Sequence, residues 1–400
     1  MPTFLPYGRQ HLDEADIQSV VGVLRADYLT CGPKVAEFEQ AFAETLGARH
    51  GVAMSSATAA LHVALLVAKI GPGDRVVTSP NTFLASANCA AYVGATPDFA
   101  DIDPVSYNLD PAAVEAGWQP GTRAVVAVDY AGQAANLPEI SRIARARGAI
   151  VIEDACHGVG GSFRHGGRIW PQGGNPWVDM ATFSFHPVKT MTTGEGGMLV
   201  TDNDEYARRA RLFRSHGMER DTSRLELFGT PGDVLAELGP WAYEMQELGF
   251  NYRITDFQCA LGISQLRRLP ALMARRREIV ARYNAAFAGL PWLVTPGVRE
   301  PASAELASWH LYTVQMDFAR IGRSRAQVMA DLRQQGIGTQ VLYIPVHLQP
   351  WYRRTHGYGP GKCPVAEACY TRALSLPLYP SMTDVDVQRV QWAVLKLARS

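Results

Sequence analysis

Lys189 is the residue of this 400-residue chain whose neighbours point most clearly to chemistry. It follows an apolar run at residues 180–184 and a bend at Pro187, and a glycine-rich apolar segment at residues 194–200 comes after it. Lysine is rarely buried without a partner, so a lone lysine in a loop would ordinarily be taken as solvated. Two groups of residues upstream argue against that interpretation.

The first group follows a short apolar strand predicted at residues 149–152. Glu153, Asp154 and His157 stand at the C-terminal end of this strand, where ligands collect in open α/β sheets. We therefore expect Asp154 to face a site, although an aspartate at such a position is also a common helix cap.

The second group is a candidate phosphate site. A strand ending near Met54 is joined through Ser55 and Ser56 to a helix that begins about Ala57. Small residues at such a junction leave the backbone N–H groups of the helix start open to a phosphate. A phosphate cradle, an acid after a strand and a lysine before a glycine-rich segment, in this order, are typical of a pyridoxal-phosphate enzyme of the aspartate aminotransferase fold.

Over essentially its whole length the chain resembles the DegT/DnrJ/EryC1/StrS family of sugar aminotransferases. The segments that carry the resemblance occur in the family's order: PYGRQ at 6–10, YLTCGP at 28–33, SAT at 56–58, TSPNTF at 78–83, VDYAGQ at 128–133, Glu153 and Asp154 with His157, FSFHPVK at 183–189, TGEGG at 193–197, RSHG at 214–217, GFNYR at 249–253 and YIPVHLQP at 343–350.

The resemblance implies a fold type I α/β protein with a large, mostly parallel-sheet domain over residues 1–255 and a smaller C-terminal α+β domain over residues 256–400. It further implies transfer of an amino group from L-glutamate to C4 of a UDP-linked 4-keto-6-deoxy-N-acetylhexosamine, as in pseudaminic acid biosynthesis. The alternatives are a C4 aminotransferase for another nucleotide-linked keto sugar, of the bacillosamine or perosamine type, and a non-catalytic regulator with the same fold. The presence of Lys189 argues against a non-catalytic regulator, because such a protein would not need the catalytic lysine.

The same resemblance implies roles for individual residues. Lys189 is the catalytic residue and forms a Schiff base with pyridoxal phosphate. The implied cofactor-binding residues are Ala57, Thr58, Phe83, Asp154, His157, Ser184 and Asn251. The implied substrate-binding residues are Tyr7, Asp27, Tyr28, Leu29, Thr30, Ala57, Ser184, Arg253, Gln340, Tyr343 and His347.

The resemblance implies a specific function for some of these residues, and some of them also have a simpler structural explanation. Asp154 would keep the pyridine nitrogen protonated, which makes the ring an electron sink. Phe83 would stack on that ring, but its plain alternative is a core aromatic. Asn251 would reach the phosphate of a neighbouring subunit, which implies a homodimer with shared active sites. Ser55 stands where close relatives usually carry Asn, so the sugar's stereochemistry stays open.

Composition agrees with a small-molecule enzyme. With 47% hydrophobic and 19% charged residues the chain can bury a large core, and 38 basic against 38 acidic residues give no net charge. We therefore expect no nucleic-acid or membrane partner. No targeting segment or apolar span is recognised, so a cytoplasmic protein is expected.

Other kinds of site are disfavoured. The six cysteines include no CxxC spacing, and the ten histidines include no HExxH, so we predict neither a disulfide framework nor a metal site. The glycines at residues 158–161 follow a strand, but their spacing is not GxGxxG and no acidic ribose partner follows.

Alternating strand-like and helical patterns predict a parallel α/β sheet. Helices are expected from Asp13, as cap, through Leu24, and from Pro33 to Gly47. The predicted strands lie near 76–77, 98–99, 124–128, 150–152 and 181–184, and long helices are expected at 260–269 and 271–287. Two irregular polar stretches, 168–177 and 219–241, are interpreted as surface excursions.

Overall fold

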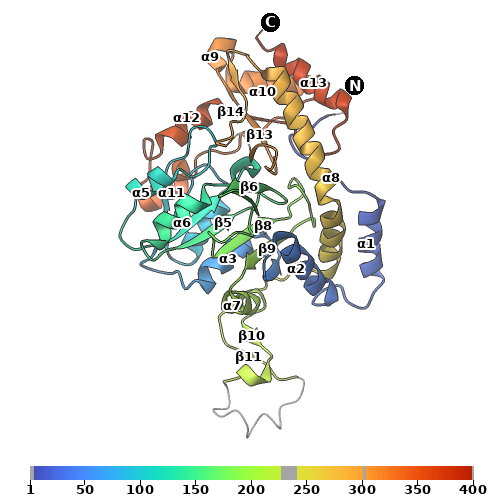
Figure 1. Cartoon of the computed structure of the whole chain (residues 1–400), viewed down its shortest axis with the longest axis vertical. Helices are drawn as coiled ribbons and strands as arrows, with labels where there is room; N and C mark the ends of the chain where they lie inside the picture. The colour runs from blue at the N-terminus through green and yellow to red at the C-terminus, as the bar shows by residue number, and fades with distance from the viewer. Residues whose placement is uncertain (1–3, 227–240, 301–302, 399–400) are drawn as a thin grey trace.

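The computed structural model describes residues 4–226, 241–300 and 303–398. Within these residues the central element is a seven-stranded sheet in the order β1-β9-β8-β5-β4-β2-β3 (Figure 1). Its strands are β1 (His50–Met54), β2 (Arg75–Thr78), β3 (Thr96–Phe99), β4 (Thr122–Val128), β5 (Ile150–Asp154), β8 (Met180–Ser184) and β9 (Gly197–Thr201). Among these seven strands of the described chain, β9 runs in the direction opposite to the other six. The expected large, mostly parallel sheet is confirmed.

The helices and the remaining strands are arranged around this sheet. The α-helices are α1 (Glu14–Leu24), α2 (Pro33–Leu46), α3 (Ala57–Val67), α4 (Ala85–Tyr92), α5 (Pro111–Ala116), α6 (Leu137–Arg145), α7 (Asp204–Arg214), α8 (Asp256–Phe287), α9 (Phe318–Ile321), α10 (Arg325–Gln334), α11 (Pro350–His356), α12 (Pro364–Arg372) and α13 (Asp384–Leu395). Short 3₁₀ helices are η1 (Tyr130–Gly132), η2 (Thr222–Arg224) and η4 (Val346–Leu348). The other strands are β6 (Ser162–His165), β7 (Arg168–Pro171), β10 (Met218–Glu219), β11 (Glu244–Met245), β12 (Leu293–Val294), β13 (Tyr312–Met316) and β14 (Ala373–Leu376).

The direction of the strands decides where a site can form. β4, β5 and β8 are mutually parallel, so their carboxyl ends at Val128, Asp154 and Ser184 meet at one edge of the sheet. Because β9 reverses direction between β8 and β1, β1 again runs parallel to β8 and ends at Met54 on the same edge. That edge therefore collects an acid, a hydroxyl and the start of α3.

Helices cover both faces of the sheet, which is why its strands are almost continuously apolar. α3, α4 and α7 pack on one face through residues such as Val126 and Leu199. α5 and α6 cover β2, β4 and β5 on the other face, and α2 covers β8 and β9 there through Phe42. Neighbouring residues such as Val125 and Val126 thus belong to opposite cores, as the alternation of a strand requires.

The first helices begin where the sequence predicts. The Asp13 side chain accepts the N–H of Asp16 at 3.0 Å, and the Asp16 carboxylate accepts the N–H of Asp13 at 3.1 Å. α2 begins at Pro33 and ends before Gly47, whose φ of 66° is a left-handed conformation that favours glycine. The start of α3 at Ala57 and the five strands expected between residues 76 and 184 are also confirmed.

The prediction of two helices after residue 259 was wrong, because α8 runs unbroken through Pro270. A proline inside a helix costs about 3 kcal/mol, since it removes one backbone hydrogen bond and its ring crowds the preceding turn. Packing on both sides of the proline offsets this cost. Leu266 and Leu269 before it, and Met273 after it, are buried in the core shared with α2.

A second core lies around the three-stranded sheet β12-β13-β14. It includes the second half of α8, α10, α13 and, from the N-terminus, Leu5, which bridges to Ile337. In Figure 1 this unit lies at the top, and α8 runs from it down the side of the large sheet. α8 therefore contributes to both cores, and the domain boundary at residues 255 and 256 stays a prediction.

The polar stretch at residues 168–177 was wrongly interpreted as lying wholly on the surface. It forms β7, which pairs with β6, and then places Gln172 in the interior with no exposed surface. Gln172 donates to Asp129 at 2.6 Å. A Cβ atom at Gly158 or Gly161 would lie 2.7 Å or 1.8 Å from the Gln172 amide. These glycines therefore make room for Gln172, which accounts for the glycine-rich segment after β5.

The described ends of the second polar stretch, residues 219–226 and 241, belong to an arm that projects from the body near α7 (Figure 1). In its root, β10 and β11 pair antiparallel, with Met218 opposite Met245 and Glu219 opposite Glu244. Residues 227–240 lie outside the described residues. The described part agrees with the expected surface excursion.

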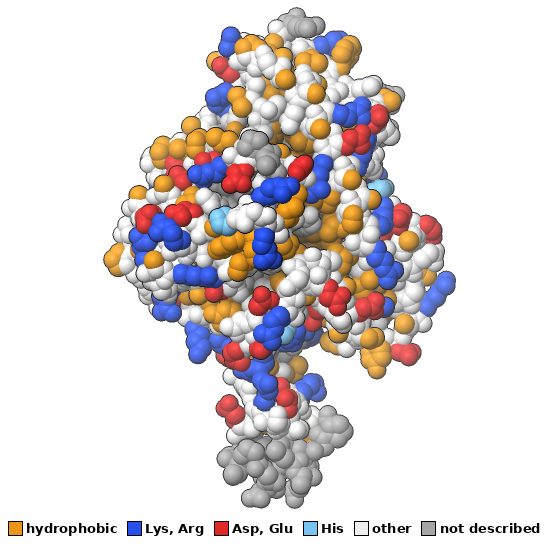
Figure 2. All heavy atoms as spheres, in the orientation of Figure 1, with side chains coloured by type: hydrophobic (Ala, Val, Ile, Leu, Met, Phe, Trp, Pro, Cys, Tyr) orange, Lys and Arg blue, Asp and Glu red, His pale blue; other side chains and the backbone are white. Residues whose placement is uncertain are grey.

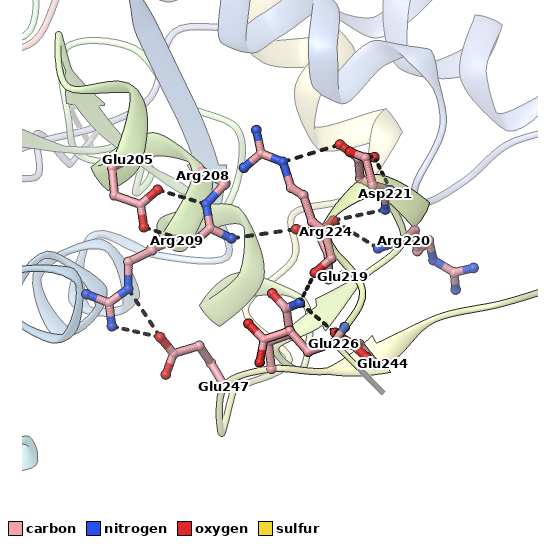
Figure 3. Close-up of polar contacts among 12 residues, drawn as sticks. Glu205, Arg208, Arg209, Glu219, Arg220, Asp221, Arg224, Glu226, Glu244 and Glu247 are labelled. Carbon is pink, nitrogen blue, oxygen red and sulfur yellow. Dashed lines mark hydrogen bonds and ion pairs between the residues drawn. The ribbon is translucent and has the colours of Figure 1, made fainter. Parts of the chain in front are cut away.

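Ion pairs hold the root of the arm against α7 (Figure 3). Arg208 of α7 contacts Glu205 at 2.8 Å and Glu219 of the arm at 3.6 Å. Arg209 contacts Glu247 at 2.8 Å. Side chains of both charges accordingly gather at the root of the arm in Figure 2. The arm is therefore anchored to the body at a fixed place.

None of the described helices is long and apolar enough to cross a membrane.

Candidate active site

A cavity of about 550 Å³ opens at the edge of the sheet where β4, β5 and β8 end. Four elements that are distant in sequence form its walls: the β1–α3 junction, the segment before α4, the turn after β8 and the segment before η4. The predicted site residues that line it are Tyr7, Ala57, Thr58, Phe83, Asp154, His157, Ser184, Lys189 and Tyr343.

The start of α3 supplies open backbone donors to this cavity. The Ser56 hydroxyl caps α3 by accepting the N–H of Ala59 at 3.1 Å, and the Ser56 carbonyl accepts the N–H of Ala60. The N–H groups of Ala57 and Thr58 belong to the first turn, which has no intrahelical acceptors. They are therefore available to an anion in the cavity.

The approach of β9 to this helix start depends on a glycine. A Cβ atom at Gly197 would lie 2.4 Å from the backbone nitrogen of Ala57. Only glycine allows β9 to lie so close to the backbone of Ala57. The glycine-rich segment after Lys189 therefore helps to form the candidate phosphate site. Ser184, at the end of β8, adds a hydroxyl to the same cavity.

Lys189 lies in a turn that hydrogen bonds hold at both ends. Its N–H donates to the carbonyl of His186 at 2.9 Å, and the Phe185 carbonyl accepts the N–H of Thr193 and the hydroxyl of Thr192. Burial lowers the pKa of Lys189 below its ordinary value, while the nearby Cys156 and Asp154 act in the opposite direction. Its amine therefore loses its proton more readily than that of an exposed lysine.

Asp154 is buried in the cavity wall at the end of β5. Its Oδ2 accepts the Ser86 hydroxyl at 2.6 Å, and its Oδ1 accepts the N–H of Cys156 at 3.2 Å. The carboxylate is thus held in place from two sides.

His157 lies beside a second imidazole and a tyrosine. Its Nδ1 accepts the N–H of Ala131 at 3.2 Å, so its Nε2 carries the proton and donates to the Tyr343 hydroxyl at 3.2 Å. Its ring centre is 4.4 Å from that of His310. Burial first, and the charge of Lys189 second, lower the pKa of both histidines well below the ordinary value. Both rings are therefore neutral at neutral pH.

Phe83 is 57% exposed and lines the cavity 6.2 Å, centre to centre, from the ring of Tyr343. The plain alternative of a core aromatic was therefore wrong, since most of this side chain is accessible. An aromatic face at a cavity mouth is suited to a flat ring.

Several predicted residues lie elsewhere. Asp27, Tyr28, Leu29 and Thr30 are exposed in the loop between α1 and α2, and Tyr28 borders a separate groove along α1 and α8. Gln340 is also exposed, and its backbone pairs with Ser375.

Asn251 and Arg253 flank Tyr252, whose carbonyl accepts the N–H of Ser55 at 2.8 Å. Asn251 is exposed and Arg253 is half-buried, and neither lines the cavity of this subunit. Their assignment to a neighbouring subunit's site stays a prediction.

His347 requires a correction, because it has no exposed surface. Its Nε2 lies 2.9 Å from Glu367 of α12, and the ring also contacts Phe99. A side chain enclosed in this way is a structural link between η4 and α12, and the geometry gives no support to a substrate contact.

Sequence reasoning missed other residues of the cavity wall, namely Thr82, Ser86, Cys156, His186, Glu195 and His310. Of these, Ser86 was detectable, because Thr82, Phe83 and Ser86 stand at the start of a helix whose first turn faces the site. His310 gave no signal in the sequence, since its position depends on how the segment before β13 packs against His157.

The donor set fits pyridoxal phosphate. Ala57, Thr58 and Ser184 can hold a phosphate, Asp154 a protonated ring nitrogen, and Lys189 a carbonyl carbon. Among the residues that the structure describes, no group of three or more His, Cys, Asp or Glu side chains is placed to hold a metal ion.

Comparisons with known proteins agree with this geometry. The sequence profile of the DegT/DnrJ/EryC1/StrS aminotransferase family matches residues 10–395. The spore coat polysaccharide biosynthesis protein SpsC of Bacillus subtilis (strain 168) is 41% identical over 397 residues, which cover 99% of this chain and 97% of that protein.

Solved structures extend the likeness to the fold. Helicobacter pylori PseC, an aminotransferase involved in the biosynthesis of pseudoaminic acid, superposes with a TM-score of 0.87 at 30% identity, covering 99% of this chain and 100% of that one. Spr1654 of Streptococcus pneumoniae, in its PLP form, gives a TM-score of 0.86 at 26% identity and covers 99% of both chains. The predicted aminotransferase-like α/β fold is confirmed, and these relatives indicate a pyridoxal phosphate cofactor.

Proposed function

Because the chain belongs to the DegT/DnrJ/EryC1/StrS aminotransferase family, we propose that it transfers the amino group of L-glutamate to C4 of a UDP-linked 4-keto-6-deoxy-N-acetylhexosamine. The observation that carries the proposal is a single cavity that joins the amine of Lys189, the carboxylate of Asp154 and the open N–H groups of α3. The likeness to PseC supports the pseudaminic acid pathway as the place of this reaction.

Pyridoxal phosphate, when bound, supplies an electron sink that stabilises a carbanion next to the transferred nitrogen. The chain's residues hold and protect this group. Ala57 and Thr58 of α3, with Ser184, would bind the phosphate, Asp154 would bind the ring nitrogen, and Phe83 would provide an aromatic surface for the ring. Lys189 would hold the carbonyl end until an amino donor takes its place.

Lys189 is also the group that moves protons. Its lowered pKa leaves a larger neutral fraction at neutral pH than an exposed lysine has. The neutral Nζ takes a proton from Cα of the donor, and in the second half of the reaction it delivers a proton toward sugar C4. Two successive half-reactions at one site predict ping-pong kinetics.

The nucleotide sugar would enter where Tyr7 and Tyr343 border the cavity. The Tyr343 hydroxyl is oriented by the Nε2–H of His157, so it can donate its own proton to a sugar oxygen. Asp27, Tyr28, Leu29, Thr30, Arg253 and Gln340 remain proposed contacts that require a partner subunit or the bound nucleotide. We place the reaction in the cytoplasm, with which the six free cysteines agree.

We propose a homodimer whose interface includes the arm. Along the strand that contains β11, Trp241, Tyr243 and Met245 are 69%, 54% and 64% exposed, whereas Ala242 and Glu244 between them are buried. An outward apolar face on an anchored strand is suited to cover by protein. A second copy is the occupant favoured here, because Asn251 follows β11 by six residues and is exposed next to the β1–α3 junction.

A C4 aminotransferase for another nucleotide-linked 4-keto-6-deoxy sugar, of the bacillosamine or perosamine type, is the second candidate. It stays open because the chain is 41% identical to SpsC, whose name gives spore coat polysaccharide biosynthesis and no particular sugar, and only 30% identical to PseC. Sequence likeness therefore does not single out the pseudaminic acid sugar.

The test is an NMR assay of the holoenzyme with L-glutamate and two UDP-4-keto-6-deoxy-N-acetylhexosamines that differ in configuration at C5. Amination of the L-configured sugar alone supports the proposal. Amination of the other sugar alone supports the second candidate. Amination of neither, with cofactor bound, contradicts the proposal and favours a different nucleotide-linked keto sugar or the non-catalytic regulator.

A further inference from the structure

We infer that Ser86, held in turn by Thr82, is a positioning residue that fixes the Asp154 carboxylate toward the ring nitrogen of the cofactor. The inference rests on the proposed function, because it assumes that Asp154 receives that nitrogen. It adds a two-hydroxyl relay behind the acid, built from the segment that also carries Phe83.

The hydrogen bonds of the relay can be assigned by counting protons. The Ser86 hydroxyl lies 2.6 Å from Asp154 Oδ2 and 3.4 Å from the Phe83 carbonyl, so its single proton points to the carboxylate. Thr82 Oγ1 lies 2.7 Å from Ser86 Oγ. Since the Ser86 proton is committed to Asp154, Thr82 must be the donor at this contact. Thr82 therefore donates to Ser86, and Ser86 donates to Asp154.

The length of the last bond matches a charged acceptor. Hydroxyl-to-carboxylate bonds fall at about 2.5–2.7 Å, shorter than most bonds between neutral groups. Thr82, Ser86 and Asp154 are all almost completely buried. Their low exposure limits the access of solvent that could replace a missing donor, and a donor that is itself polarised by another hydroxyl stabilises the carboxylate further.

The relay also fixes the direction of the carboxylate. Oδ1 is held by the N–H of Cys156 and Oδ2 by Ser86, so rotation of the group would break a bond on either side. Ser86 lies in the first turn of α4, whose N-terminal end favours a negative charge nearby. The segment of Thr82 to Ser86 thus aligns both the acid and the aromatic wall of the cavity.

The test uses the holoenzyme reconstituted with cofactor labelled with ¹⁵N in the ring, and measures the ¹⁵N chemical shift and the dissociation constant of the cofactor. In Ser86→Ala we expect the ring ¹⁵N signal to move toward the unprotonated position, and the dissociation constant to rise roughly tenfold or more, the range for loss of a hydrogen bond to a charged group. Thr82→Val should move both in the same direction by less. In the double variant the Thr82 substitution should add almost nothing, because its effect passes through Ser86.

Ser141→Ala is the matched control, since Ser141 is a buried serine on α6, away from the cavity. It should change thermal stability without moving the ¹⁵N signal. An unchanged ¹⁵N signal in Ser86→Ala, or equal and additive effects of Thr82→Val in the presence and absence of Ser86, would overturn the relay. Failure of the wild type to bind the cofactor would instead overturn the proposed function and the relay together.

Discussion

The imidazole rings of His157 and His310 lie 4.4 Å apart, centre to centre, in the wall of the cavity that also holds Lys189. Three buried basic groups thus lie in the wall of one cavity. Burial first, and the charge of Lys189 second, lower the pKa of both histidines, and His157 lowers the pKa of His310 further.

This arrangement predicts destabilisation by mild acid. Both histidines have lower pKa values in the folded chain than the roughly 6.5 of an unfolded one, so the unfolded state binds more protons below that pH. Each histidine should reduce the free energy of unfolding by up to about 1.4 kcal/mol per pH unit as the pH falls from about 6.5 toward its folded pKa. Urea unfolding at fixed protein concentration from pH 8 to pH 5 measures this slope. His310→Gln should flatten it, and an identical slope in that variant would show that His310 does not contribute.

The cradle at the start of α3 should be sensitive to one methyl group. Gly197→Ala places a Cβ against the backbone of Ser56 and Ala57, so the helix start must shift away. We expect the dissociation constant of pyridoxal phosphate to rise at least roughly tenfold and stability to fall by about 1–3 kcal/mol. Fluorescence titration and thermal melting measure the two effects. Gly359→Ala, where a Cβ meets nothing within 4 Å and φ is not left-handed, is the control and should bind normally.

The arm should decide the oligomeric state. Met245→Glu introduces a charge into the exposed apolar face of β11, where burial in an interface would cost several kcal/mol. We expect the variant to shift from dimer toward monomer in analytical ultracentrifugation. Val385→Glu removes an equally exposed apolar side chain on α13 and should leave the sedimentation unchanged. A dimer of unchanged stability in Met245→Glu would exclude the arm from the interface.

Shared active sites predict complementation between two inactive variants. If Asn251 serves the partner's site, a mixed dimer of Lys189→Arg and Asn251→Ala subunits contains one site with both native residues. Mixing and refolding the two variants should therefore restore turnover that neither shows alone. Absence of recovery, with mixed dimers demonstrated by mass, would place Asn251 in the site of its own subunit or outside any site.

Much of the site was predictable because the carboxyl ends of parallel strands lie at the same edge of the sheet. Asp154 after β5, Ser184 after β8 and the helix start after β1 follow from apolar runs that can be recognised locally. The resemblance to a family then added Phe83 and Tyr343, and both residues line the cavity.

Other features depend on contacts between distant parts of the chain. Ser86 meets Asp154 across 68 residues, and Tyr343 meets His157 across 186. The continuous α8 was mispredicted because a proline ends most helices. In this helix the packing of the residues around Pro270 on α2 keeps the helix continuous. Gln172 was assigned to the surface because a buried amide has no sequence pattern that distinguishes it from an exposed one.

The proposed reaction transfers the nitrogen of L-glutamate to the sugar while Lys189 moves the protons, and its most direct measurement is an NMR assay with L-[¹⁵N]glutamate and the UDP-4-keto sugar that the enzyme accepts. The wild-type holoenzyme should place ¹⁵N on sugar C4. Lys189→Arg should reduce this transfer by roughly a thousandfold or more, because arginine stays protonated and cannot take the Cα proton. Absence of ¹⁵N from the sugar formed by the wild type, or turnover by Lys189→Arg at a comparable rate, would contradict the account.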